Sequence, residues 1–219
     1  MIHLFALLSL LLCGVCYTGF QNSSHFHNTS NRRSLLLLVF GGALLLRLLL
    51  AYTTHGFSND IACFAAWADR IFTLGPGQFY SAEMFTDYPP GFMYVLYLIG
   101  ALRSLLQIPY YSDLHILLLK LPAILCDIAC GFLLYREAVK RLHFSDLQGI
   151  FAASAYLFQP AVILNSSCWG QVDSVYTLMI ILMCLFLMKG NLLPAYAVYG
   201  LGVLLKPQML IFTPVLLEG

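Results

Sequence analysis

Long apolar runs constrain this chain more than any other feature of its sequence. Residues 34–53 are interrupted only by Arg47, and residues 113–135 form a second run of similar character. About 20 apolar residues are needed for a helix to cross the hydrocarbon core of a bilayer. Only 10% of the residues are charged and 60% are hydrophobic, whereas soluble domains have about 25% and about 45–50%. The sequence therefore predicts an integral membrane protein.

Further apolar segments extend this pattern towards the end of the chain. Residues 149–164, 174–188 and 192–205 are separated by short polar stretches, and residues 208–217 begin another segment. Backbone groups in lipid must find their hydrogen bonds within the protein, which favours helices. We predict an all-α fold, a polytopic transmembrane helix bundle with about six to seven spans.

The first 33 residues divide into two parts. Residues 1–20 are nearly all apolar but lack the positively charged start of a secretory signal, so they predict an extra span or an uncleaved anchor. Residues 21–33 form a polar linker, and residues 34–219 form the main transmembrane module, with an outer loop at residues 54–112. The chain stops within an apolar segment, which indicates the N-terminal part of a longer protein.

The outer loop carries two helices that we expect to lie against the membrane. Apolar residues recur with helical spacing between residues 59 and 73, which predicts an amphipathic helix in the interface. A basic segment follows residues 113–135 and should be cytoplasmic. Because a crossing at residues 91–106 would place that basic segment outside, we interpret residues 91–106 as a second juxtamembrane helix.

With this orientation, polar groups from five segments reach the outer membrane face. Arg32 and Arg33 precede the first span and place its start in the cytoplasm. The gathered residues are Asp60, Asp69, Arg70, Glu83, Asp87, Tyr88, Lys120, Trp169, Gln171, Asp173 and Lys206. Ionisable groups in or near a bilayer are costly and usually functional. Their convergence predicts a site on that face.

Several of these residues also have a purely structural interpretation. Asp60 is an acid in the first turn of a helix, where it would stabilise the helix dipole by about 0.3–1 kcal/mol, or it is a general base. Lys206 is either a snorkelling lysine at a helix break or a cation for a phosphate. Asp173 suits a helix cap, whereas Trp169 and Gln171 are not needed for one and suit sugar binding.

Lys120, a divalent cation and nucleic acid each have alternatives on the sequence as well. Lys120 and Asp127 are seven residues apart on one helix face, so either they pair in the membrane or Lys120 points outward to an anion. Asp60 and Asp173 could share a divalent cation, but two acids are too few to predict a metal site. There is no basic patch or nucleic-acid motif, so nucleic acid is not a predicted partner.

Four short runs together resemble the GT-C superfamily of polytopic glycosyltransferases. They follow an acid just outside the first span, and they read DYPP (87–90), KLP (120–122), WGQVDS (169–174) and LKP (205–207). Within the superfamily, the chain is most similar to glucosyl- and mannosyltransferases that use dolichyl- or polyprenyl-phosphate sugars. The resemblance covers residues 34–217, and the chain departs from it in the extra segment 1–20 and in lacking a C-terminal half.

This resemblance implies a hexosyltransferase of the bacterial plasma membrane or the endoplasmic reticulum membrane. It would move mannose or glucose, with inversion, from a polyprenyl-phosphate-linked donor to a lipid-linked glycan or protein acceptor on the lumenal or extracytoplasmic face. Asp60 would be the catalytic base. Substrate binding is expected at Asp87, Tyr88, Trp169, Gln171 and Asp173, and binding of the lipid phosphate at Lys206, Lys120 and Arg70.

Two other classes of function stay open on the sequence. Half of a lipid or sugar transporter would need charges near the bilayer midplane and an internal repeat. Only Asp127 and Arg47 lie that deep, and no repeat is evident. A non-catalytic or truncated membrane subunit would fit a chain that ends within an apolar segment.

Overall fold

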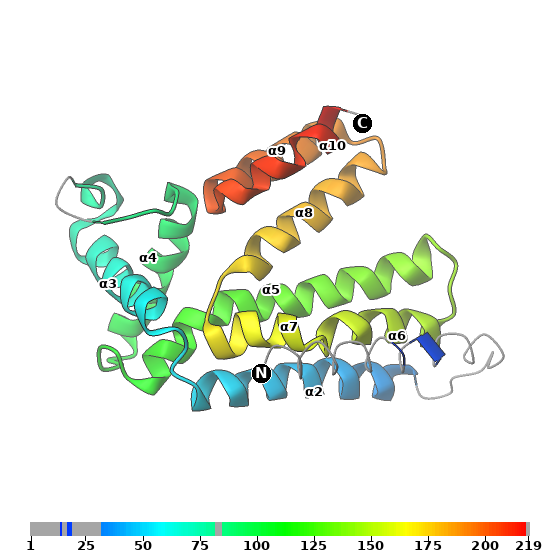
Figure 1. The fold of residues 1–219 in the computed structure, drawn as a ribbon, viewed down its shortest axis with the longest axis horizontal. Helices are drawn as coiled ribbons and strands as arrows, with labels where there is room; N and C mark the ends of the chain where they lie inside the picture. Colours follow the sequence, from blue (N-terminus) through cyan, green and yellow to red (C-terminus); the bar gives the residue numbers. More distant parts are fainter. Residues whose placement is uncertain (1–13, 15–16, 19–31, 82–84, 218–219) are drawn as a thin grey trace.

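Long helices lying side by side dominate the computed structural model (Figure 1), which describes residues 14, 17–18, 32–81 and 85–217. Helices α2 (Arg32–Thr53) and α5 (Asp113–Lys140) pack against each other and against α6 (Asp146–Leu157). The described part of the chain is helical and contains no strand, which confirms the predicted all-α class. The predicted N-terminal segment 1–20 and linker 21–33 lie almost entirely outside the described residues.

Fewer helices can cross a bilayer than the sequence predicted. In the described part of the chain, α2 and α5 are long and apolar enough, and α6 with the bent segment Pro160–Trp169 adds a third if the two are one broken span. Helices α8 (Asp173–Leu187) and α9 (Leu192–Leu205) have only 15 and 14 residues. At 1.5 Å per residue each is roughly 22 Å long, against about 30 Å of hydrocarbon. The prediction of six to seven spans is therefore not supported, because helix breaks divide the apolar runs.

The segment after α6 is more helical than the sequence predicted. Helix α7 (Pro160–Ile163) follows a bend of 51°, and the π-helix η2 (Leu164–Trp169) continues directly from it. Pro160 cannot donate a backbone hydrogen bond, so α6 ends before it. Gly170 ends η2 in the left-handed conformation, with φ of +87°. In the polar stretch between the apolar segments 149–164 and 174–188, residues 170–172 alone lie outside a helix, and Asp173 begins α8.

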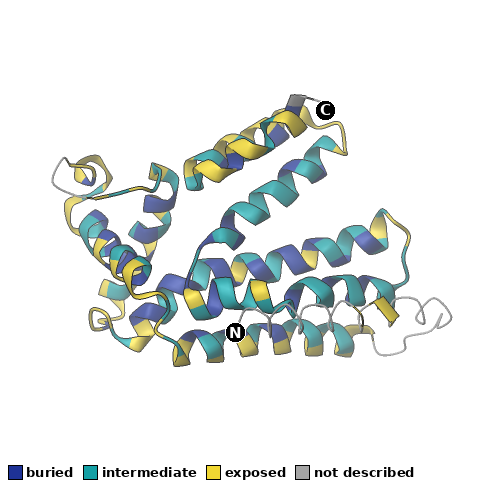
Figure 2. Ribbon diagram, viewed as in Figure 1, coloured by how far each residue is buried: buried dark blue, intermediate teal, exposed yellow. Residues whose placement is uncertain are grey.

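Helices α3 (Ser58–Leu74) and α4 (Pro90–Leu105) pack together at the end of the molecule away from the α5–α6 connection (Figure 1), where the sequence predicted two loop helices. Figure 2 shows buried positions along both helices. The buried residues of α3 are Ile61, Phe64, Ala65, Trp67, Ala68 and Ile71. Gly100 permits the close approach, because a Cβ there would lie 2.4 Å from the carbonyl oxygen of Ala68. An ion pair between Asp69 and Arg103 also joins the pair.

Helices α8 and α9 form an antiparallel pair that returns the chain to α4. Helix α8 packs on α5, and α9 packs on both α8 and α4. A Cβ at Gly91 would lie 2.6 Å from the carbonyl oxygen of Leu204, so the start of α4 touches the end of α9. The helices η3 (Pro207–Phe212) and α10 (Thr213–Leu217) follow. This contact brings Lys206 to the α3–α4 end of the molecule.

A buried ion pair lies at the centre of the long helices. Arg47 of α2 and Asp127 of α5 are both fully buried, with 3.1 Å between Nε and Oδ2. Asp127 also accepts hydrogen bonds from the hydroxyls of Ser166 (2.6 Å), Ser174 (2.5 Å) and Tyr156 (3.2 Å). The predicted pairing of Asp127 with Lys120 is therefore wrong. One carboxylate connects α2, α5, α6, η2 and α8.

We predict that Asp127→Asn destabilises the fold strongly. The substitution leaves the Arg47 guanidinium buried without its counter-charge, and breaking a buried pair in this way costs about 3–5 kcal/mol. Unfolding in detergent micelles, followed by circular dichroism, measures the difference. Asp113→Asn is the matched control, because Asp113 is half-exposed and lies 3.6 Å from an exposed His55. It should cost less than about 1 kcal/mol, and equal losses from the two substitutions would contradict the prediction.

Candidate functional site

An open cleft of about 460 Å³ lies where four segments meet at the α3–α4 end of the molecule. The segments are the start of α3, the stretch before α4, residues 170–172 and the α9–η3 junction. Its lining residues are Asp60, Asp87, Tyr88, Gln171, Lys206, Pro207 and Gln208. The structure therefore brings together five of the residues that the sequence assigned to a site.

A chain of hydrogen bonds orients the carboxylate of Asp60. This residue lies in the first turn of α3, whose N-cap residue, Phe57, makes no side-chain capping hydrogen bond. The amide nitrogen of Gln171 donates to Asp60 Oδ2, and the Gln171 oxygen accepts from the Tyr88 hydroxyl at 3.5 Å. The three side chains come from three segments. Gln171 thus links the Tyr88 hydroxyl to the Asp60 carboxylate.

Burial raises the pKa of Asp60 above the usual range of an aspartate. The Gln171 hydrogen bond acts in the opposite direction and lowers the pKa, the negative charge of Asp87 raises it, and the positive charge of Lys206 lowers it. A carboxylate with a raised pKa holds a proton more readily, so it is a better general base than an exposed aspartate.

Lys206 provides the positive charge of the cleft. It stands between α9 and η3 in an extended conformation, as expected of a residue before a proline. Its side chain is only 12% exposed and forms an ion pair with Asp173. Its Nζ lies 5.8 Å from the ring centre of Tyr88 and 5.6 Å from that of Tyr176. The ammonium group is thus held between one carboxylate and two aromatic rings.

Tyr88 is fixed by an aromatic cluster beneath the cleft. Its ring packs against those of Phe64 at 5.5 Å, Phe92 at 5.3 Å and Trp67 at 5.8 Å. The hydroxyl of Tyr80 donates to its carbonyl oxygen at 3.0 Å. Burial raises the pKa of Tyr88 far above that of a free phenol. Its hydroxyl therefore stays protonated and remains a hydrogen-bond donor.

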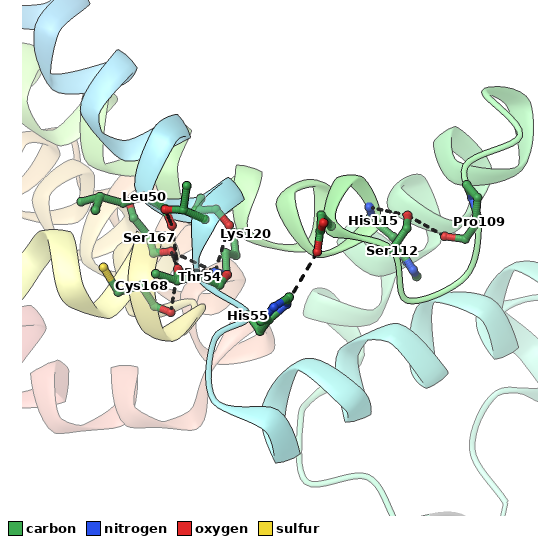
Figure 3. Close-up of polar contacts among 12 residues, drawn as sticks. Leu50, Thr54, His55, Pro109, Ser112, His115, Lys120, Ser167 and Cys168 are labelled. Atoms are coloured by element: carbon green, nitrogen blue, oxygen red, sulfur yellow. Dashed lines mark hydrogen bonds and ion pairs between the residues drawn. The ribbon is translucent and has the colours of Figure 1, made fainter.

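Lys120 lies outside the cleft and points into the protein (Figure 3). It is fully buried. Its Nζ donates to the carbonyl oxygens of Ala51 (3.2 Å), Thr54 (2.6 Å) and Ser167 (3.0 Å), and to the Thr54 hydroxyl (3.1 Å). These acceptors use all the hydrogen-bonding capacity of an ammonium group. Lys120 thus joins the end of α2 to η2, and the structure does not bring it to the other predicted phosphate ligands.

Arg70 is also outside the cleft lining. Its Nε donates to the carbonyl oxygen of Phe79 at 3.0 Å, and its Nη2 donates to the Ser81 hydroxyl at 3.1 Å. The guanidinium group holds the stretch after α3 against that helix.

Trp169 lines a separate apolar pocket of about 330 Å³ with Phe57 and Gly56. The rings of Trp169 and Phe57 are 5.9 Å apart, and the Trp169 carbonyl oxygen accepts from the Phe57 backbone at 2.8 Å. A Cβ at Gly56 would lie 2.7 Å from that same oxygen. Only glycine allows this approach, and its φ of +79° also favours glycine. Gly56 is not among the residues predicted from the sequence, although a glycine just after an apolar span is a usable signal for such a contact.

Gln208 also lines the cleft and is not among the residues predicted from the sequence. It lies two residues after Lys206, and a polar side chain at a break between apolar helices is the signal that could have identified it. In the described part of the chain, no group of three or more His, Cys, Asp or Glu side chains is placed to hold a metal ion.

Comparisons with known proteins add no assignment to this cleft. No protein family model matches the chain, and no curated protein or solved structure matches it. The resemblance to GT-C glycosyltransferases thus rests on the sequence runs alone, and the geometry of the cleft carries the functional argument.

We predict a characteristic pH dependence of stability for Asp60. Because its pKa is raised in the folded state, the folded protein binds this proton more tightly than the unfolded chain does. Wild type should therefore gain stability relative to Asp60→Asn as the pH falls through the folded pKa towards the ordinary value for aspartate. Thermal unfolding of both proteins between about pH 4 and 8 measures the difference. A relative loss of wild-type stability on acidification would contradict the assigned environment of Asp60.

Proposed function

We propose that this protein is a membrane glycosyltransferase of the GT-C type, with its site in the cleft at the α3–α4 end. The donor is a hexose, mannose or glucose, on a polyprenyl or dolichyl phosphate. The acceptor is a hydroxyl of a lipid-linked glycan or of a protein. The observation that carries the proposal is the meeting of Asp60, Gln171 and Lys206 in one cleft from three distant parts of the chain.

The proposed reaction needs a base on one side of the anomeric carbon and a cation on the other. Asp60 accepts the proton of the acceptor hydroxyl, whose oxygen attacks the anomeric carbon and inverts it. The bond to the lipid phosphate breaks, and the phosphate leaves with the electron pair. Lys206 stabilises the charge on the departing phosphate, an electrostatic role worth several kcal/mol in related sites. A phosphate is a good leaving group, so no general acid is required.

The remaining cleft residues bind and orient the substrate in this proposal. Tyr88 donates from its protonated hydroxyl, and Gln171 holds the Asp60 carboxylate in place. Asp87 adds a carboxylate that accepts hydrogen bonds from sugar hydroxyls. Asp173 holds Lys206 at the cleft while the donor is absent.

The proposal also assigns an orientation and a membrane arrangement. The cleft faces the lumenal or extracytoplasmic side, and the basic segment at the far end of α5 faces the cytoplasm. The α8–α9 pair lies within the membrane although each helix is shorter than a straight span. The membrane is the endoplasmic reticulum membrane or the bacterial plasma membrane.

We expect Asp60→Asn to reduce transfer from a polyprenyl-phosphate hexose by about 10²–10⁴-fold, which is the usual contribution of a general base. Purified membranes with a radiolabelled donor give the rate. Asp113→Asn is the matched control, since Asp113 also lies in the first turn of a helix but does not line the cleft. It should retain near-normal transfer, which separates base catalysis from loss of a helix-dipole contact. Near-normal transfer by Asp60→Asn would end the assignment.

We expect Lys206→Met to lower kcat by about 10²–10³-fold, because it removes the charge that stabilises the departing phosphate. Lys206→Arg should recover part of this loss, since the positive charge remains at the helix break. The measurement is the initial rate at saturating donor. If the Met and Arg variants were equally impaired, packing at the α9–η3 junction rather than charge would explain the effect.

A further inference from the structure

A second pocket, of about 440 Å³, lies at the opposite end of the molecule from the cleft. It lies between the end of α5 and the turn from α8 into α9. Both of these stand at the end of the molecule that holds the α5–α6 connection (Figure 1). Its lining residues are Arg136, Glu137, Lys140, Arg141, Met188 and Lys189. Four of these six side chains are cationic and one is acidic. The transferase chemistry proposed above uses none of them.

The single acid of this pocket is already paired. Nε and Nη2 of Arg136 both donate to Glu137 Oε1, at 2.9 and 2.6 Å. Three cations therefore remain beyond this ion pair. The ends of α5 and α8 each carry roughly half a negative charge from the helix dipole. One cation is enough to offset both ends, so the pocket retains a positive excess.

Arg141 connects the two helix ends that form this pocket. Its Nη2 donates to the carbonyl oxygen of Met188 at 2.7 Å, which joins the end of α5 to the end of α8. Its Nη1 is buried and has no hydrogen-bond partner among the described residues. A buried charged donor without a partner is costly. An anion in the pocket would satisfy it, with Lys140 and Lys189 exposed on the rim.

We propose that this pocket is a binding site for a phosphate group, carried by an anionic phospholipid or present as a free phosphate ion. Planar guanidinium groups match the oxygens of a phosphate, and lysines add flexible positive charge. The pocket lies at the end of a long apolar helix, level with lipid headgroups if α5 crosses the bilayer. The pocket follows the apolar run at residues 113–135 in the sequence. Basic residues are concentrated there, which indicates that this end of α5 faces the cytoplasm.

The test uses the full chain purified in an uncharged detergent and a fluorescent phosphatidic acid as the probe. A phosphatidylcholine with the same acyl chains and fluorophore is the reference lipid. Wild type should bind phosphatidic acid more tightly than this reference. The double variant Lys140→Gln/Lys189→Gln removes two exposed positive charges. It should weaken phosphatidic acid binding roughly 30-fold, because each Lys near an anionic lipid surface contributes about 1 kcal/mol.

The matched control is Arg32→Gln/Arg33→Gln, which removes two exposed cations away from the pocket lining. It lowers the net charge equally, so it should change binding by less than about threefold if the effect is local. Thermal unfolding of each variant checks that the fold is retained.

Competition identifies the source of the phosphate. Displacement of the probe by millimolar inorganic phosphate supports a site for the free ion, whereas resistance to it supports a lipid headgroup site. Equal weakening by the two double variants, or equal affinity of wild type for phosphatidic acid and phosphatidylcholine, would overturn the proposal. Transfer activity is not part of the readout, so this result is independent of the assignment of the cleft.

Discussion

The ion pair between Arg47 and Asp127 is the interaction on which the rest of the structure depends. Two buried charges are costly to desolvate, and they are tolerated when each is paired and hydrogen-bonded. Asp127 meets this condition with three hydroxyl donors in addition to Arg47. Two of these donors, Ser166 and Ser174, stand on either side of residues 170–172 in the sequence. The Asp127 carboxylate therefore holds both ends of the short segment that carries Gln171 into the cleft.

Lys120 supports the same segment from the other side. It has no carboxylate partner among the described residues, and carbonyl oxygens from the end of α2 and from η2 surround its ammonium group. Gly170 completes this contact, because a Cβ there would lie 2.6 Å from a side-chain carbon of Ile61 in α3. The hydrogen bonds of Lys120 and this close packing thus hold the end of α2, the start of α3 and the segment that carries Gln171 together. A site needs such support if its acid is to stay oriented.

The sequence predicts local features of this chain better than it predicts long-range partners. Residues 192–205 are helical over the expected bounds, since a break at Lys206 and Pro207 ends the helix by local chemistry. The distribution of basic residues also placed Asp60 and Lys206 at one end of the molecule, as the structure does. By contrast, the partner of Asp127 lies 80 residues away, and helical spacing within α5 pointed to Lys120 instead. The same apolar character that predicted further spans does not reveal where a π-helix or a bend ends them.

Charge in the cleft sets a condition on how a phosphate-linked sugar could bind. Asp60 and Asp87 line the cleft, Asp173 is paired with Lys206, and Lys206 is the single cation in the lining. A phosphate therefore meets an excess of negative charge unless Lys206 exchanges Asp173 for the incoming group. Asn165 makes this exchange less costly, because its amide donates to the other oxygen of Asp173 at 2.9 Å and would remain bound.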